Sequence, residues 1–211
     1  MEKIKDESSK ARILEAATTL FAQKGFDGTS IREICKTANV NLCMISYYWG
    51  GKQELYQGII ENLLEKQIEY SKDFLDLNKN PYDMSADECK KLLADVMEKF
   101  VDFFYTNISS DLIVILLKEQ QKPDFIVKAP VLDYIRRMVA RILNKDVNDR
   151  IVIFKMLFML SQINSPRILP AFSLRILNQK DFCKEDIDII KDNVKLYINK
   201  ILKEEGEINE T

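Results

Sequence analysis

The chain has 211 residues, of which 46% are hydrophobic and 30% charged, and its 31 Lys and Arg nearly balance its 33 Asp and Glu. This composition is typical of one or two compact domains and excludes disordered, collagen-like and strongly basic proteins. The sequence contains no histidine, which excludes Ser-His and Cys-His nucleophilic catalysis, His-Glu di-iron sites and most zinc sites.

Two predicted helices follow one another near the N-terminus. The first has apolar residues at helical spacing from Ile13 onward and ends at Gly25, because glycine readily adopts the left-handed conformation that closes a helix. Ser30 and Glu33 have the spacing of a capping box, which predicts the start of a second helix. We expect this helix to reach about Ala38.

A sharp turn and a third short helix come next. Asn39 tolerates the left-handed conformation that a tight interhelical turn requires. Asn41 is a favourable N-cap residue, and it predicts a third helix over residues 42–49 that Gly50 and Gly51 end.

A longer helix, from Lys52 into the seventies, opens the remainder of the chain. Ser85 and Glu88 form a second capping box before another helical pattern. Further helices are predicted at residues 111–121, 131–144, 147–162, 166–178 and 184–203. No segment has the alternating pattern of a strand, so the predicted fold class is all-α.

Glycine and proline divide the chain. Five of the six glycines lie in the first 58 residues, and all five prolines come later. This distribution predicts a small N-terminal domain with tight turns, residues 1–52, and a larger helical domain, residues 53–211.

Residues 29–52 have the layout of a helix-turn-helix, whose second helix can enter a DNA major groove about 12 Å wide. Hydroxyl, amide and cationic donors lie at helix starts, where phosphate groups bind. These candidates are Thr29, Arg32, Asn41 and Lys52, and Tyr47 and Tyr48 add phenolic donors. Three short helices with tight turns also occur in proteins that do not bind DNA, so periodicity alone leaves the function open.

A set of residues continues in register across these three helices. It comprises Arg12-Ile13-Leu14-Glu15-Ala16-Ala17, Leu20-Phe21, Gly25, Thr29-Ser30-Ile31, Ile34, Ala38, Val40, Tyr48-Trp49 and residues 52–55. In this set, roughly residues 10–56 resemble the N-terminal signature of the tetracycline-repressor (TetR) family of transcriptional regulators. The resemblance implies a ligand-responsive repressor with a DNA-binding head and a helical domain that binds an effector and dimerises.

Helical geometry gives the third helix an outer and an inner face. The outer, groove-facing set is Leu42, Cys43, Ser46 and Tyr47, with Met44 beside it, whereas Val40, Ile45 and Trp49 point inward. The chain departs from the family pattern at five positions. Asn39 stands where the family has glycine, and Asn41 stands where it has a capping serine. Cys43 stands in place of glycine or alanine, Ser46 in place of tyrosine, and Trp49 in place of phenylalanine. The loss of tyrosine at position 46 makes Tyr47 and Tyr48 the stronger phosphate-contact candidates.

Charge predicts a dimer on a palindromic operator. Residues 1–56 contain eight Lys and Arg against seven Asp and Glu, so affinity for double-stranded DNA must come from placed contacts, and one head would bind weakly. A symmetric homodimer presents two recognition helices about 34 Å apart, one DNA turn.

The C-terminal helices are the candidates for the dimer interface and for a pocket that binds an unknown small-molecule effector. Ten of the thirteen residues 151–163 are apolar, so this helix must be covered inside the domain or across a subunit interface. In the family, two C-terminal helices commonly form that interface, and 147–162 or 166–178 with 184–203 are the candidates here. The candidate apolar pocket residues, which core packing explains equally well, are Phe100, Phe103, Phe104, Tyr105, Tyr134, Met138, Phe154, Met156, Phe158 and Met159.

Two other functional classes, an enzyme and an interaction protein, differ from a DNA-binding regulator in the residues they need. An all-α enzyme would need a metal-binding repeat, a Gly-rich phosphate loop or a nucleophile motif, and the sequence has none; we predict neither cofactor nor metal. A helical interaction protein with a degenerate head is the alternative that Ser46 leaves open.

No apolar run reaches the roughly 18 residues of a membrane span, and no secretory signal begins the chain, so a cytoplasmic location is expected. Cys35, Cys43, Cys89 and Cys183 lack paired spacing and are expected to be reduced and mostly buried.

Overall fold

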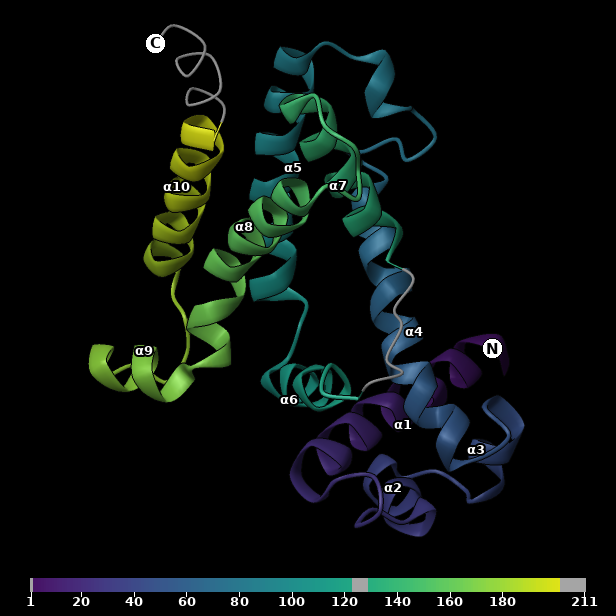
Figure 1. Cartoon of the computed structure of the whole chain (residues 1–211). Helices are drawn as coiled ribbons and strands as arrows, with labels where there is room; N and C mark the ends of the chain where they lie inside the picture. Colours follow the sequence, from purple (N-terminus) through teal and green to yellow (C-terminus); the bar gives the residue numbers. More distant parts are fainter. Residues whose placement is uncertain (1, 123–128, 202–211) are drawn as a thin grey trace, which may run out of the picture. The chain divides into compact units, whose positions relative to one another are not determined.

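The structure of the chain is a computed structural model that describes residues 2–122 and 129–201 (Figure 1). Within these residues it contains ten α-helices, one 3₁₀ helix and no strand, which confirms the all-α prediction. The first helices are α1 (Glu2–Lys24), α2 (Ile31–Ala38), α3 (Cys43–Tyr48) and α4 (Lys52–Ser71). They are followed by η1 (Pro81–Asp83), α5 (Ala86–Thr106), α6 (Ser110–Glu119), α7 (Pro130–Leu143), α8 (Arg150–Ile168), α9 (Pro170–Leu177) and α10 (Lys184–Ile201).

The chain forms two compact units. The first comprises Met1–Lys66 and Ser109–Val127, and the second comprises Gln67–Ile108 and Lys128–Thr211. This division is one of spatial compactness, and the functional boundary between residues 52 and 53 stays a prediction.

The first unit has a core of its own, to which its five helices contribute. Ile13, Phe21, Ile34, Ile45 and Leu55 are each at most 1% exposed. Removing such side chains from water stabilises the fold by roughly 1.5–3 kcal/mol each. This packing holds α2 and α3 in place, since helices of their length are not stable alone.

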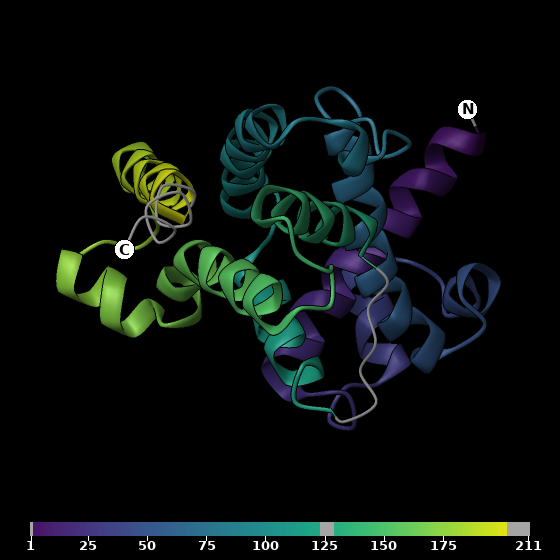
Figure 2. The ribbon, with the colours of Figure 1, turned by 45° about the horizontal axis from the view of Figure 1, so that its top comes forward.

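The second unit is built from α5, α7, α8 and α10, which contact one another (Figure 2). The predicted capping box at the start of α5 is confirmed, because Ser85 Oγ and the Glu88 side chain each accept the other residue's backbone N–H. Three ion pairs join α10 to α5, one of them a 4.0 Å contact between Lys191 and Glu98. Lys191 Nζ lies 2.7 Å from Asp102 Oδ1, and a second lysine of α10 pairs with Glu98.

Several helices end on a residue in the left-handed conformation. Gly25 (φ 75°), Asn39 (φ 51°) and Gly50 (φ 89°) have it where the sequence predicts a helix end. In the second unit, Asn144 (φ 50°) and Asn178 (φ 53°) close α7 and α9 in the same way. Asparagine therefore replaces the glycine that is most common at such ends.

The predicted break between residues 162 and 166 is wrong. α8 continues through Pro166 to Ile168, and the chain leaves helical geometry at Leu169 (φ −116°, ψ 55°). A proline disfavours the helical conformation in the residue before it, and here that effect acts at Pro170, the first residue of α9. α8 also begins later than predicted, because the Asp149 side chain accepts the N–H of Ile151.

One side of α8 is apolar and exposed. Ile151, Phe154, Leu157 and Phe158, here called the α8 outer face, are 43–56% exposed. The expectation that the two phenylalanines line an interior pocket is therefore wrong. Apolar residues of α9 and α10 are also more than half exposed, namely Phe172, Ile176, Leu177, Ile189 and Leu196.

The expectation of mostly buried thiols is half right. Cys35 and Cys89 are buried, Cys43 and Cys183 are exposed, and all four are free. Among the residues that the structure describes, no single helix is long and apolar enough to cross a membrane, and only α5 and α6 taken together have that length and composition.

Candidate nucleic-acid interface

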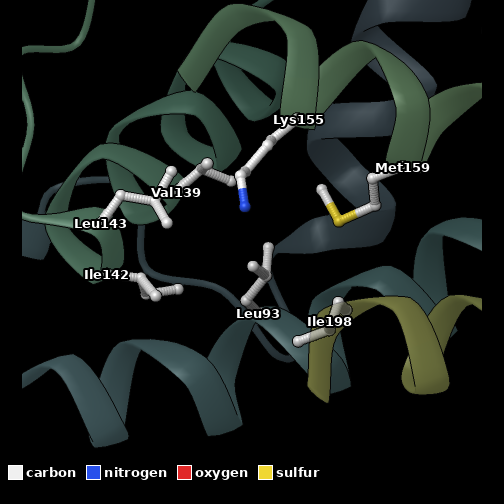
Figure 3. A pocket seen from close by; sticks show the side chains of 7 residues that line it. All are labelled: Leu93, Val139, Ile142, Leu143, Lys155, Met159 and Ile198. Atoms are coloured by element: carbon white, nitrogen blue, oxygen red, sulfur yellow. The ribbon is translucent and has the colours of Figure 1, made fainter. Parts of the chain in front are cut away.

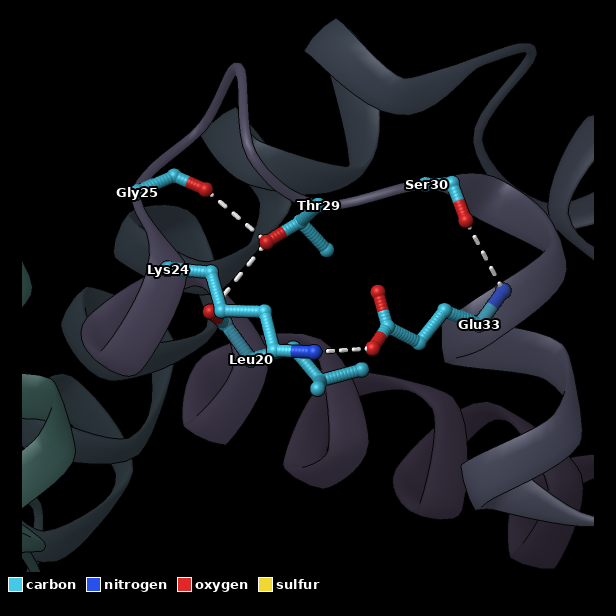
Figure 4. A network of polar contacts seen from close by, with 6 residues as sticks. All are labelled: Leu20, Lys24, Gly25, Thr29, Ser30 and Glu33. Carbon is cyan, nitrogen blue, oxygen red and sulfur yellow. Dashed lines mark hydrogen bonds and ion pairs between the residues drawn. The ribbon is translucent and has the colours of Figure 1, made fainter.

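α2 and α3 form a helix-turn-helix. Ser30 Oγ accepts the N–H of Glu33 (3.2 Å) at the start of α2. The Glu33 carboxylate does not complete the predicted capping box, because it pairs with Lys24 of α1 (Figure 4). This hydrogen bond from Lys24 lowers the pKa of Glu33. The ion pair therefore joins the end of α1 to the first turn of α2.

The turn between α2 and α3 is held by backbone hydrogen bonds. Asn39 donates its N–H to the carbonyl of Lys36 (3.3 Å), and Val40 donates to that of Cys35 (3.0 Å). Asn41 Oδ1 then accepts the N–H of Cys43 at 3.4 Å, which is the capping role that the sequence predicts for this asparagine.

α3 has an inner and an outer face. Ile45 is fully buried, while Val40 and Trp49 pack partly buried against the core. Of the outer set, Leu42 is 47% and Tyr47 74% exposed, and Cys43 and Ser46 are exposed as well. Met44 and Tyr48, also predicted to contact DNA, are partly buried against the core, and their contact with DNA stays a prediction.

Thr29, two residues before the start of α2, is buried. Its side chain is 2% exposed, and its hydroxyl is shared between the carbonyls of Gly25 (2.8 Å) and Leu20 (3.1 Å) (Figure 4). The hydroxyl that was predicted to reach a phosphate is therefore already bonded inside the protein. Thr29 holds the loop between α1 and α2.

Cations lie at the helix starts. Arg32 is exposed in the first turn of α2. Lys52 is the first residue of α4, and its ammonium lies 4.3 Å from the centroid of the Phe26 ring. Lys10 of α1 lies with its ammonium 5.9 Å from the Trp49 ring. Sequence reasoning did not find Lys10, because only the packing of α1 brings it near the end of α3.

The Trp49 ring packs against Gly58 of α4. A Cβ added at Gly58 of α4 would lie 2.6 Å from Trp49 Nε1, closer than unbonded atoms pack. The ring also contacts Tyr48, with centroids 5.4 Å apart, and Tyr48 in turn contacts Tyr47 at 5.1 Å. Gly58 thereby makes room for an indole where the family pattern has phenylalanine.

α6 belongs to the same unit and is bonded to it by polar side chains. Thr19 donates to Asp111 (2.8 Å), and Lys118 donates to the carbonyl of Ala22 (3.0 Å), so both ends of α6 are tied to α1. The Tyr56 hydroxyl of α4 donates to Glu119 at 2.6 Å. Burial, with this hydrogen bond, raises the pKa of Tyr56. Within the described residues, no group of three Cys, Asp or Glu could hold a metal ion.

Comparison with known proteins gives matches of two kinds. Residues 13–59 match the family described as bacterial regulatory proteins, tetR family. The probable HTH-type transcriptional regulator YttP of Bacillus subtilis is 50% identical over 58 residues, 28% of each chain. The negative transcriptional regulator IcaR of the biofilm operon icaADBC, from Staphylococcus epidermidis, is 32% identical over 105 residues, 48% of this chain and 54% of IcaR.

The fold has solved counterparts over nearly the whole chain. The transcriptional regulator FadR from Bacillus subtilis, solved in complex with stearoyl-CoA, aligns with a TM-score of 0.57 at 16% identity. The alignment covers 89% of this chain and 96% of FadR. At this identity the likeness shows the fold alone. The sequence matches span about half the length of IcaR and less of YttP.

Proposed function

We propose that this chain, which belongs to the TetR family of bacterial regulatory proteins, is a ligand-responsive repressor that binds a palindromic DNA operator as a homodimer. The coarser role of DNA-binding transcriptional regulator rests on the family and its relatives, one of which is a negative regulator. The family consists of regulators, and we assign the chain no reaction. Its place of action is the cytoplasm, where chromosomal DNA is found.

The exposed face of α3 carries the proposal. Leu42, Cys43, Ser46 and Tyr47 project from a helix whose opposite side is anchored in the core. Two of these side chains are apolar or nearly so, and suit thymine methyl groups better than the bidentate pairing of Arg with guanine. Discrimination then depends on Ser46, on bridging water and on DNA shape.

Phosphate contacts flank this face. We assign them to Arg32, Asn41, Tyr47 and Lys52, of which two are cations at helix starts, where the helix dipole also favours an anion. Lys52 is partly exposed, and its ammonium lies beside Phe26. We assign Thr29 to positioning the loop instead of contacting phosphate, because its hydroxyl is bonded internally.

The homodimer is supported by the uncovered apolar surface of the second unit. A large exposed apolar patch on a protein of this size is typical of an interface. The α8 outer face has the spacing of one helix side, and Ile189 and Leu196 repeat seven residues apart on α10. We therefore propose α8 and α10 of both subunits as the interface.

Effector response requires that a ligand favours a conformation with lower DNA affinity. We propose that α4 carries this change, because it runs from the first unit into the second. FadR, which shares the fold, was solved with stearoyl-CoA, and a ligand in the second unit of this chain is a proposal by analogy.

Fluorescence anisotropy tests the function directly. The purified chain is titrated into a labelled duplex from the region upstream of its own gene and into a scrambled duplex of equal length. We expect preference for the first duplex, with two chains bound per site. Tyr47→Ala should weaken binding, whereas Tyr82→Ala, at an exposed tyrosine of the second unit, serves as the matched control. Equal, weak binding to both duplexes would favour an interaction protein with a degenerate head.

A further inference from the structure

α9 is an apolar helix that the described part of the chain leaves uncovered. It contains no buried residue, and its side chains Phe172 and Ile176 are 73% and 70% exposed. Arg175 is the only charged residue between positions 168 and 177. In Figures 1 and 2, α9 lies beyond α8, on the side away from α5 and α7. A helix that is apolar nearly all round is normally covered on most sides, so α9 needs a partner.

The direction of α9 is fixed by its connection to α8. In a continuous helix the carbonyl of Pro166 would accept the N–H of residue 170, but Pro170 has no N–H. The Ser173 hydroxyl donates to that carbonyl instead, at 2.8 Å. Asn178, in the left-handed conformation (φ 53°), closes the other end of α9. α9 is therefore held on the end of α8 and presents a constant side to its surroundings.

The interior of the second unit is filled by its other helices. Leu93 of α5, Met159 of α8 and Ile198 of α10 are each at most 3% exposed. Figure 3 shows these side chains directed toward one another between the helices. Because a protein core is packed as densely as an organic crystal, α9 cannot bury Phe172 by turning inward. The cover for α9 therefore lies outside this core.

The exposed side of α9 continues the α8 outer face. Ile168, the last residue of α8, comes eleven residues, or three helical turns, after Leu157 of that face and is 39% exposed. Leu169 follows directly and is 58% exposed. Leu169, Phe172 and Ile176 then recur at intervals of three and four residues, the spacing of one helix side. One apolar surface thus continues from α8 along α9.

The area of this surface fits a second copy of the chain. An obligate homodimer buries about 1,000–2,500 Å² per subunit, of which about two thirds is apolar. If a large apolar side chain has about 200 Å² of surface, the exposed parts of the α8 outer face and of Ile189 and Leu196 on α10 amount to roughly 600 Å². α8 and α10 alone therefore supply the lower end of that range. The five exposed apolar side chains from Ile168 to Leu177 add about as much again.

We propose that α9 is a clasp that binds a second copy of this chain. Its apolar side packs against the partner subunit beside the interface of α8 and α10, and the partner's α9 does the same in return, as two-fold symmetry requires. The inference rests on the proposed function, because it extends the dimer interface proposed there. A lipid surface suits α9 less well, because helices that lie on membranes have a polar face rich in Lys and Arg, and α9 has a single arginine.

Tryptophan emission tests whether a second copy covers α9. In a Trp49→Phe background, which removes the single tryptophan of the chain, Phe172→Trp places the only indole on α9. We expect blue-shifted emission at micromolar concentration, and a red shift on dilution with the midpoint that sedimentation gives for dimer dissociation. Tyr82→Trp in the same background, at an exposed tyrosine of the second unit, is the matched control and should emit like an exposed indole at every concentration.

Sedimentation equilibrium measures the strength of the contact in the chain that keeps Trp49. Truncation of a buried aromatic anchor commonly weakens an interface at least about tenfold, so Phe172→Ser should raise the dimer dissociation constant by that factor or more. Phe172→Leu, which keeps a large apolar side chain, should retain most of the affinity. Tyr82→Ser should leave the dissociation constant unchanged. Circular dichroism verifies that each variant is folded.

Three results would overturn the clasp. These are exposed emission from Phe172→Trp in a sample that sediments as a dimer, sedimentation as a monomer at micromolar concentration, and a blue shift that appears only when anionic phospholipid vesicles are added. The proposed function fails separately. If the dimer forms with a buried indole but binds no operator, the clasp stands and the regulator falls. If a dimer with an exposed indole binds the operator, the regulator stands and the clasp falls.

Discussion

The contact between Trp49 and Gly58 predicts that Gly58→Ala, which would normally stabilise a helix, does not stabilise this protein. Gly58 lies inside α4, where replacing glycine with alanine normally stabilises a helix by about 1 kcal/mol. The added Cβ would lie 2.6 Å from Trp49 Nε1 and 2.9 Å from its Cδ1. Moving a packed ring costs roughly 1–3 kcal/mol. Gly58→Ala should therefore change stability by anything from nearly zero to about 2 kcal/mol of destabilisation.

Removing the ring should reverse the effect. In a Trp49→Ala background the Cβ has space, so Gly58→Ala should stabilise by about 1 kcal/mol. The coupling energy of the double-mutant cycle is then about 1–3 kcal/mol. Gln57, exposed and next to Gly58 in α4, gives the matched control, because the difference between Gln57→Ala and Gln57→Gly measures helix propensity without the ring contact.

Urea unfolding followed by far-UV circular dichroism measures the cycle, since the optical signal does not depend on the tryptophan that is removed. Trp49 is the single tryptophan of the chain, so its emission also reports displacement of the ring in Gly58→Ala. Operator affinity should fall in this variant, because the ring supports Tyr48 at the end of α3. If Gly58→Ala stabilises equally in both backgrounds, the close contact does not exist.

Three further predictions concern the interface, the dimer and alkaline pH. Lys52→Ala should weaken binding to operator and random duplexes about equally, whereas Ser46→Ala should change which operator is preferred; electrophoretic titration that gives the reverse ranking contradicts the assignment of phosphate and base contacts. Phe158→Glu, on the α8 outer face, should convert the proposed dimer to monomer in sedimentation at micromolar concentration, and an unchanged dimer would exclude this face as the subunit interface. Burial raises the pKa of Tyr105, so its contribution to stability is present below the unfolded-state pKa of roughly 10 and is lost as pH rises above it. Urea unfolding at about pH 8 and about pH 10.5 should show this loss, and Tyr105→Phe should reduce it.

Features set by neighbouring residues could be predicted from the sequence. The left-handed Asn39, the cap at Asn41 and the two faces of α3 each depend on a few consecutive positions, and their geometry is as predicted. The buried state of Ile45 follows from helical spacing once α3 is placed. These local predictions agree with the structure because the few residues between two short helices have little choice of backbone conformation.

Features set by distant residues could not be predicted in this way. Thr29 has the residue type and position of a phosphate donor, yet two carbonyls on α1 and its following turn occupy its hydroxyl. Glu33 has capping-box spacing, yet a lysine nine residues earlier in the chain takes its carboxylate. In both cases a tertiary partner competes with the local one, and periodicity contains no information about that competition.

α6 shows the same limit at a larger scale and bears on how the regulator works. Its bonds to α1 connect residues 92 and 96 positions apart in the chain, a distance over which no pattern of spacing is informative. These bonds and the one from Tyr56 to Glu119 make α6 part of the first compact unit, which therefore contains more than the three helices of the predicted DNA-binding head. The chain then enters this unit again at Ser109, directly after the end of α5. If the chain responds to an effector as proposed, a displacement of that end of α5 would reach α1 along the chain through α6, in addition to the connection that α4 makes.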